Sequence, residues 1–174
     1  MDQIDINKIW RNFVDTITNH YTDFNGRVGR PQFWYYVLAY VVIGIGVAIV
    51  GSIVAMGGAL RGLYALLLFL PSVGMTSRRI QDTGRPGTWA WLLAVPVAVQ
   101  ILLAMFVVFA FMTFGIGLIF APLMGLLELA SLAAIVVIIY FCAQPGTAGS
   151  NAYGAPPVPW TPTSAISPTA PPAI

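Results

Sequence analysis

The chain has 174 residues, of which 58% are hydrophobic and only 8% are charged. A soluble domain carries about 25% charged residues and a disordered chain has low hydropathy, whereas the mean hydropathy here is +0.82. The composition therefore excludes soluble globular and disordered proteins and indicates a chain that resides in lipid.

The totals also limit the partners and the chemistry. A net charge of +2 gives no reason to expect a nucleic-acid partner. One cysteine, Cys142, and one histidine, His20, exclude an internal disulfide and any multi-Cys or multi-His metal site. The sequence contains no nucleophile elbow, phosphate loop or paired-carboxylate motif. We therefore expect no enzymatic activity and no cofactor.

The first 24 residues predict an amphipathic helix. Its apolar side chains recur at steps of three and four residues, at Ile6, Ile9, Trp10, Phe13, Ile17 and Tyr21. Such a helix either lies on the membrane surface or packs on the membrane-spanning bundle.

Two spans are expected next. Residues 25–32 form a turn-rich basic segment, and residues 33–56 contain no charge. As a helix, 24 residues rise about 36 Å, enough to cross a hydrocarbon core of about 30 Å. Gly57 and Gly58 interrupt the run, and residues 58–77 are predicted to form the second span.

A second polar segment, residues 78–87, precedes an apolar run from 88 to 143 that carries one formal charge. This run is too long for one helix, so it must fold back. Gly115 and Gly117 indicate the break and give spans at 88–112 and 117–143. The fold class is thus an all-α integral membrane protein, a small bundle of about four transmembrane helices within residues 25–143.

The C-terminal segment, residues 144–174, contains eight prolines and no charge. It offers too little apolar surface to offset the entropy lost on ordering. We predict a Pro-rich disordered tail.

The cations predict the orientation, because cytoplasmic loops are rich in Lys and Arg. With four spans and a cytoplasmic N-terminus, seven of the eight Lys and Arg residues lie in the cytoplasm, and Arg61 lies on the other side. Three spans would keep the same N-terminus and place the tail outside.

The arginines near the cytoplasmic ends of the spans form the first candidate site. They can serve simple anchoring, or grip the phosphates of anionic lipids at about 1 kcal/mol per cation. A third interpretation is a structural clamp in which Asp82 and Asp23 pair with these arginines and join the two polar segments. The candidate residues are Arg27, Arg30, Arg78, Arg79, Asp82 and Arg85.

Gln100 and Glu128 form the second candidate site. Glu128 is the only acid within an apolar span, and ionisable groups inside a bilayer are costly. Both residues lie near the middle of their predicted spans, so an antiparallel pair of helices brings them to similar depth. They are expected to face each other, either as an interhelical hydrogen bond or as a proton- or cation-sensitive site.

Three short motifs carry a resemblance to a known family. Residues 24–30, followed by Phe33-Trp34, are similar to the pattern F-x-G-R-x-x-R-x-x-F/Y-W. Residues 78–84 resemble R-R-L-H-D-T-G, with Gln81 in place of the His, and residues 149–154 resemble G-x-N-x-Y/F-G. In this order, over roughly residues 10–157, they resemble the bacterial domain-of-unknown-function family eight-zero-five of small inner-membrane proteins. The resemblance implies a location in the bacterial cytoplasmic membrane and no settled activity.

The sequence therefore predicts a non-enzymatic scaffold, regulator or envelope accessory. Its expected partners are membrane lipids, anionic ones among them, and either another membrane protein or further copies of the chain as a homo-oligomer. The alternative is a small transporter or channel subunit that uses Gln100 and Glu128.

Overall fold

The structure is a computed structural model that describes residues 6–54, 56–113 and 115–157. In this part of the chain it is all-α, as predicted. Four helical segments are long and apolar enough to span a membrane: Arg30–Ile53, Gly57–Asp82, Gly87–Met112 and Gly117–Ala143. The elements in order are α1 (Ile6–Asn19), α2 (Arg30–Ile53), α3 (Gly57–Asp82), the 3-10 helix η1 (Gly87–Leu93), α4 (Ala94–Met112), the 3-10 helix η2 (Ile116–Phe120) and α5 (Ala121–Ala143).

The second span is longer than predicted at its C-terminal end. The sequence placed its end at residue 77, whereas α3 continues through Arg78 and Arg79 to Asp82. The helix can continue past residue 77 because the polar side chains of this last turn are buried against other parts of the protein and do not face lipid. It stops before Gly84, whose φ of 81° is the left-handed conformation that commonly ends a helix.

The long apolar run folds back at the predicted place. Gly115 has a φ of 86°, and η2 follows it directly. A Cβ on Gly117 would lie 2.9 Å from the Cα of Ala110, so a glycine lets the turn pack onto the end of α4. Pro122 lies in the first turn of α5, where its missing N–H costs nothing.

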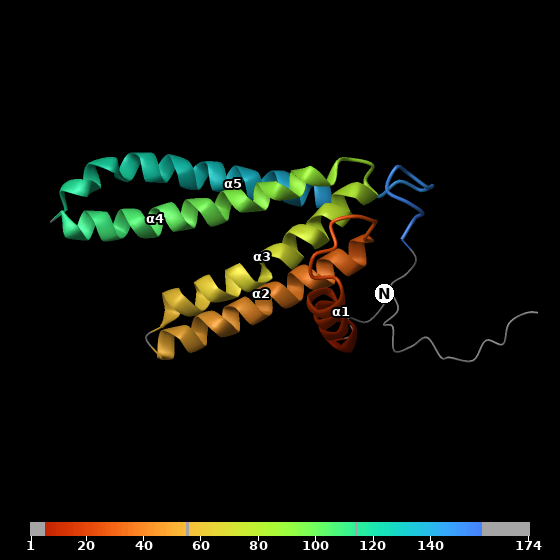
Figure 1. The fold of residues 1–174 in the computed structure, drawn as a ribbon, viewed down its shortest axis with the longest axis horizontal. Helices are drawn as coiled ribbons and strands as arrows, with labels where there is room; N and C mark the ends of the chain where they lie inside the picture. The colour runs from red at the N-terminus through yellow and green to blue at the C-terminus, as the bar shows by residue number, and fades with distance from the viewer. Residues whose placement is uncertain (1–5, 55, 114, 158–174) are drawn as a thin grey trace, which may run out of the picture.

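The helices form two antiparallel hairpins, α2–α3 and α4–α5, and α1 packs across α2. Figure 1 shows the hairpins meeting at one end and diverging toward the other. The last turns of α3, η1 and the end of α5 all lie at the joined end. We refer to this joined end as the polar end.

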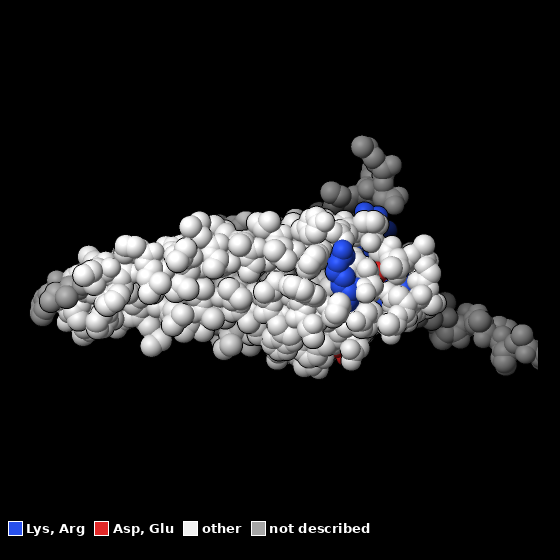
Figure 2. Space-filling view, turned by 90° about the horizontal axis from the view of Figure 1, so that it is seen from above, with Lys and Arg blue, Asp and Glu red and all other residues white. Residues whose placement is uncertain are grey.

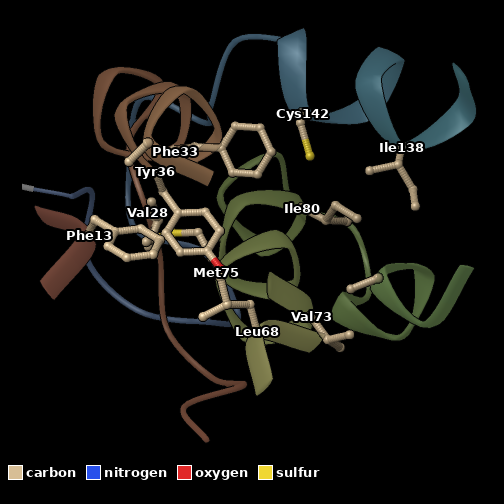
Figure 3. Close-up of a cluster of buried hydrophobic side chains, with 12 residues drawn as sticks. Phe13, Val28, Phe33, Tyr36, Leu68, Val73, Met75, Ile80, Ile138 and Cys142 are labelled. Carbon is tan, nitrogen blue, oxygen red and sulfur yellow. The ribbon is translucent and has the colours of Figure 1, made fainter. Parts of the chain in front are cut away.

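The packed core lies at the polar end. It combines side chains from α1, α2, α3 and α5, so four elements separated in sequence are held together there (Figure 3). Its buried members include Phe13, Phe33, Tyr36, Met75, Ile80 and Cys142. Helix α4 takes little part, since only 6% of the most apolar window of Gly87–Met112 is buried.

Helix α1 packs on the bundle, one of the two arrangements expected for it. Asn12, Phe13 and Thr16 are buried, and the Asn12 side-chain amide donates a 2.9 Å hydrogen bond to the carbonyl of Gln32. Its opposite side keeps apolar groups exposed, with Ile6 at 78% and Trp10 at 57%. The helix therefore joins the core on one face and offers an apolar edge to lipid on another.

Most charged residues of the described chain lie at the polar end, whereas Arg61 lies near the start of α3 and Glu128 lies within α5. On the face shown in Figure 2, the coloured Lys, Arg, Asp and Glu atoms lie at the polar end, and the elongated remainder is uncharged. Large apolar side chains such as Ile45, Leu66, Met105 and Leu129 are exposed along that remainder. An exposed apolar surface of this length requires lipid or protein around it.

Candidate functional site

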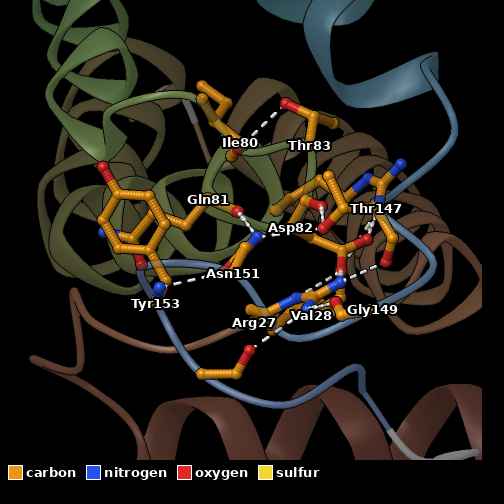
Figure 4. A network of polar contacts seen from close by, with 12 residues as sticks. Arg27, Val28, Ile80, Gln81, Asp82, Thr83, Thr147, Gly149, Asn151 and Tyr153 are labelled. Atoms are coloured by element: carbon orange, nitrogen blue, oxygen red, sulfur yellow. Dashed lines mark hydrogen bonds and ion pairs between the residues drawn. The ribbon is translucent and has the colours of Figure 1, made fainter.

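The three sequence motifs meet at the polar end. The loop before α2, the last turn of α3 and the segment after α5 lie against one another, as Figure 4 shows. The backbone N–H of Val28 donates to the carbonyl of Arg78 at 3.2 Å, and the N–H of Thr147 donates to the carbonyl of Asp82 at 2.9 Å. Segments up to 127 residues apart in sequence thus form one unit.

Asp82 is the centre of this unit. One carboxylate oxygen accepts a hydrogen bond from Nε of Arg27 at 2.9 Å, and lies 2.8 Å from the Nη2 atom of the same residue. The other oxygen accepts from Nη1 of Arg79. The exposed fractions of the three side chains are 4% for Asp82, 2% for Arg27 and 0% for Arg79. We name this buried trio the arginine clamp.

Arg79 ties the end of α5 to the clamp. Its Nε donates to the carbonyl of Cys142 at 2.9 Å, and its Nη2 donates to the carbonyl of Gln144. Its Nη1 also donates to the carbonyl of Val28 at 3.3 Å. Each guanidinium nitrogen therefore has a partner within the protein, which leaves this arginine unavailable to an external phosphate.

Arg27 binds the segment that follows α5. Its Nη1 donates to the carbonyls of Gly149 at 2.7 Å and Gly154 at 3.2 Å, and its Nη2 donates to the carbonyl of Thr147 at 2.6 Å. All three acceptors are main-chain carbonyls. These contacts of Arg27 therefore depend on the backbone conformation of the segment and not on the identity of its side chains.

The structure describes residues 144–157, the first part of the predicted tail, as a return loop against the polar end. The prediction counted apolar burial, whereas this loop is held by hydrogen bonds to buried arginines. Residues 158–174 of the predicted tail lie outside the described residues.

Asn151 explains much of the third motif. Its side-chain amide donates to the carbonyl of Gln81 at 2.9 Å, and this carbonyl in the last turn of α3 also accepts from the N–H of Gly84 at 3.0 Å. Its side-chain oxygen accepts from the N–H of Tyr153 at 2.8 Å, forming a tight turn that closes at Gly154 with a φ of 121°. Sequence reasoning noted the motif and missed these contacts.

Gly146 is the point of closest approach between the return loop and α3. A Cβ at this position would lie 2.0 Å from a carboxylate oxygen of Asp82. No rotation of a small side chain relieves such an overlap, because the Cβ position is fixed by the backbone. The sequence pattern gave no signal for this residue.

We expect Gly146→Ala to lower the thermal stability of the purified protein. The added methyl group must displace either Asp82 or the loop, at a cost of about 1–3 kcal/mol typical of overpacking. Melting in detergent, followed by tryptophan fluorescence, measures the effect. Gly149→Ala is the matched control, since nothing lies within 4 Å of its Cβ position. Equal melting temperatures for the two variants would contradict the packing described.

The other candidate arginines have separate roles. Arg85 donates to the side-chain oxygen of Gln144 at 2.6 Å and lies over the ring of Phe141, 5.0 Å from its centre. Arg78 is buried, and its Nε and Nη2 have no hydrogen-bond partner among the described residues. Arg30 is exposed at the start of α2. The predicted basic group is thus divided between internal contacts and a free surface.

Asp23 differs from Asp82 in its partner. It lies 2.7 Å from Nδ1 of His20, with more than half of its side chain exposed, and makes no ion pair with an arginine among the described residues. The hydrogen bond with His20 lowers the pKa of the Asp23 carboxyl below its ordinary value. The expected pairing of Asp23 with an arginine is therefore not what the structure contains.

Gln81 stands where the motif of the resembling family has a histidine. Its side-chain amide donates to the carbonyl of Phe24 at 3.0 Å, and Ser77 donates to the same carbonyl at 2.8 Å. The position thus fastens the loop before α2 to α3.

The second candidate site lies in the α4–α5 hairpin, away from the polar end. Nε2 of Gln100 lies 3.1 Å from a carboxylate oxygen of Glu128, so the two residues expected to face each other are hydrogen-bonded. Gln100 is exposed and Glu128 is half-buried. With these exposures, the pair lies at the surface of the hairpin.

The protein is therefore an all-α, multi-pass membrane protein whose polar end is held together by a buried ion-pair cluster. The family model described as "Protein of unknown function (DUF805)" matches residues 21–155, and the chain belongs to this family. The membership predicted from the three motifs is confirmed.

Curated relatives agree with the membrane location. The chain is 28% identical to inner membrane protein YhaI of Escherichia coli strain K12 over 82% of this chain and 92% of that protein. It is 33% identical to inner membrane protein YhaH of the same strain, over 46% of this chain and 70% of that protein. No solved structure gives a significant match.

Proposed function

We propose that this protein is a non-enzymatic accessory of the bacterial inner membrane whose polar end contacts lipid headgroups. The supporting observation is the division of the arginines. Arg27 and Arg79 satisfy internal groups, whereas Arg30 and Arg11 remain exposed. The exposed guanidinium groups at the polar end can bind lipid phosphates without any catalytic step.

Exposed tryptophans support the same proposal. Trp34 is 38% exposed, Trp89 45% and Trp91 51%. Tryptophan prefers the headgroup level because its ring is apolar and its N–H is polar.

An N-terminus on the cytoplasmic side follows from the distribution of Lys and Arg. Labelling of Asn19→Cys with an impermeant maleimide, added to either side of the membrane, tests this orientation.

The absence of a free reactive group at the clamp favours a non-enzymatic role. Asp82 is the acid that an acid–base reaction at this place would need, and both of its oxygens are engaged. The transporter alternative has less support, because Gln100 and Glu128 lie on the outside of a hairpin.

We expect the double variant Arg11→Gln/Arg30→Gln to retain about 30-fold less phosphatidylglycerol, relative to phosphatidylethanolamine, after purification in mild detergent. Two cations at about 1 kcal/mol each account for an effect of this size. Lipid mass spectrometry measures it. The charge-conserving control, Arg11→Lys/Arg30→Lys, should stay within about twofold of the unsubstituted protein. Unchanged lipid retention in the Gln variant would refute the headgroup role.

A further inference from the structure

The Gln100–Glu128 pair occupies an unusual place for polar groups. Gln100 lies near the middle of the span Gly87–Met112, and Glu128 lies near the middle of Gly117–Ala143. At such a depth water is absent, and a polar group exposed to hydrocarbon is costly. The pair nevertheless lies on the outside of the hairpin, with Gln100 exposed.

The hydrogen bond between the two side chains leaves part of each unused. Nε2 of Gln100 donates one of its two N–H groups to one oxygen of Glu128. The second N–H of Gln100 and the second oxygen of Glu128 have no partner within the described part of the chain. One surface therefore carries an unused donor beside an unused acceptor.

We propose that a second copy of this chain covers this face, with Gln100 of each copy donating to Glu128 of the other. A two-fold axis along the bilayer normal places identical residues of two copies at the same depth, and such an interface is self-complementary. The two reciprocal bonds use only the amide N–H and a carboxyl oxygen, so they form in either protonation state of the acid.

The hairpin surface permits the close approach that this contact needs. Ala121 and Gly125 precede Glu128 on the same side of α5, and nothing lies within 4 Å of a Cβ placed on Gly125. Small residues at four-residue spacing let two membrane helices pack closely. The most apolar windows of the two spans in this hairpin are 6% and 22% buried, against 17% and 28% for the two spans of the other hairpin.

A second copy suits this face better than the chain's own α2–α3 hairpin does. Figure 1 shows α4 and α5 diverging from α2 and α3 beyond the polar end, where the arginine clamp fixes their relative position. The inference is independent of the proposed lipid contact, because that contact lies at the polar end and this one lies at mid-depth.

Cysteine cross-linking in native membranes tests the proposal. Leu132→Cys lies one turn after Glu128 on the same side of α5, and Leu126→Cys lies across the helix as the matched control. The two leucines have similar exposure, 57% and 62%, and the native Cys142 is fully buried. We expect oxidative cross-linking to give a dimer with Leu132→Cys, and at least tenfold less with Leu126→Cys.

Substitution of the polar pair provides the second measurement. Glu128→Leu, and separately Gln100→Leu, should each reduce the Leu132→Cys dimer about tenfold, whereas Glu128→Gln should retain it because an amide oxygen also accepts. Equal cross-linking at positions 132 and 126 would overturn the proposal. So would no dimer at position 132 when its thiol reacts with a lipid-soluble maleimide, or a dimer unaffected by both leucine variants.

Discussion

Asp82→Ala is expected to destabilise the protein by about 3–5 kcal/mol. The carboxylate is the shared partner of Arg27 and Arg79, whose side chains are 2% and 0% exposed. Removal of one member of a buried charge cluster leaves the others uncompensated, which costs far more than the net value of the intact pair. Two guanidinium groups would be left with their carbonyl contacts alone. Reversible unfolding in mixed micelles, titrated with a denaturing detergent, measures the change.

Asp23→Ala is the matched control for this prediction. Asp23 also has a close side-chain partner, since Nδ1 of His20 lies 2.7 Å from its carboxylate, yet 52% of the Asp23 side chain is exposed. Exposed pairs contribute about 0–1 kcal/mol, so this variant should unfold almost like the unsubstituted protein. A small loss for Asp82→Ala, similar to that of Asp23→Ala, would mean that the clamp is not buried in solution.

Arg79→Lys should lose about 2–4 kcal/mol although it conserves the charge. The guanidinium of Arg79 reaches the carbonyls of Cys142, Gln144 and Val28 as well as Asp82 from three different nitrogens. A lysine ammonium presents its donors from one point and cannot span these acceptors, so buried carbonyls lose their partners at about 1–3 kcal/mol each. The same unfolding titration measures the loss.

Arg30→Lys is the corresponding control, since Arg30 is exposed and, within the described residues, takes no part in the hydrogen bonds or ion pairs of the clamp. A surface change of this kind usually alters stability by less than about 0.5 kcal/mol. Equal stability of Arg79→Lys and the unsubstituted protein would show that the hydrogen bonds from the Arg79 guanidinium to Cys142, Gln144, Val28 and Asp82 do not form.

The membrane-spanning segments were predictable because they follow from composition and length. A run without charge, such as residues 33–56, has only one low-energy environment, and the helix is the only conformation that satisfies its backbone there. The predicted break near Gly115 was also local, since it depended on the excess length of the run. Helix ends were less predictable, and α3 exceeds its expected end by the five residues 78–82.

The path of the return loop was not predictable from local composition. Residues 144–157 are rich in glycine, proline and small polar residues, which on their own indicate disorder. Their path depends on Arg27 and Arg79, which lie far away in sequence and donate to their carbonyls. The similarity of residues 149–154 to a motif was the one signal that this segment has a defined role.

The arginines were grouped by sequence reasoning and separated by the fold. Arg27, Arg30 and Arg79 are the same residue type near the same end of the bundle, so the sequence offered no basis to distinguish them. Burial makes the distinction: two of them lie in the clamp and the third remains exposed. The interpretation as a lipid contact and the interpretation as a clamp therefore apply to different members of one predicted set.

A double-mutant cycle between Arg27 and Asp82 tests the central claim, that distant motifs are joined by a buried ion-pair cluster. The unfolding free energies of Arg27→Met, Asp82→Leu, the double variant and the unsubstituted protein provide the coupling. We expect a coupling of about 1–3 kcal/mol between these residues, which are 55 positions apart. Additive effects, within about 0.5 kcal/mol, would contradict it.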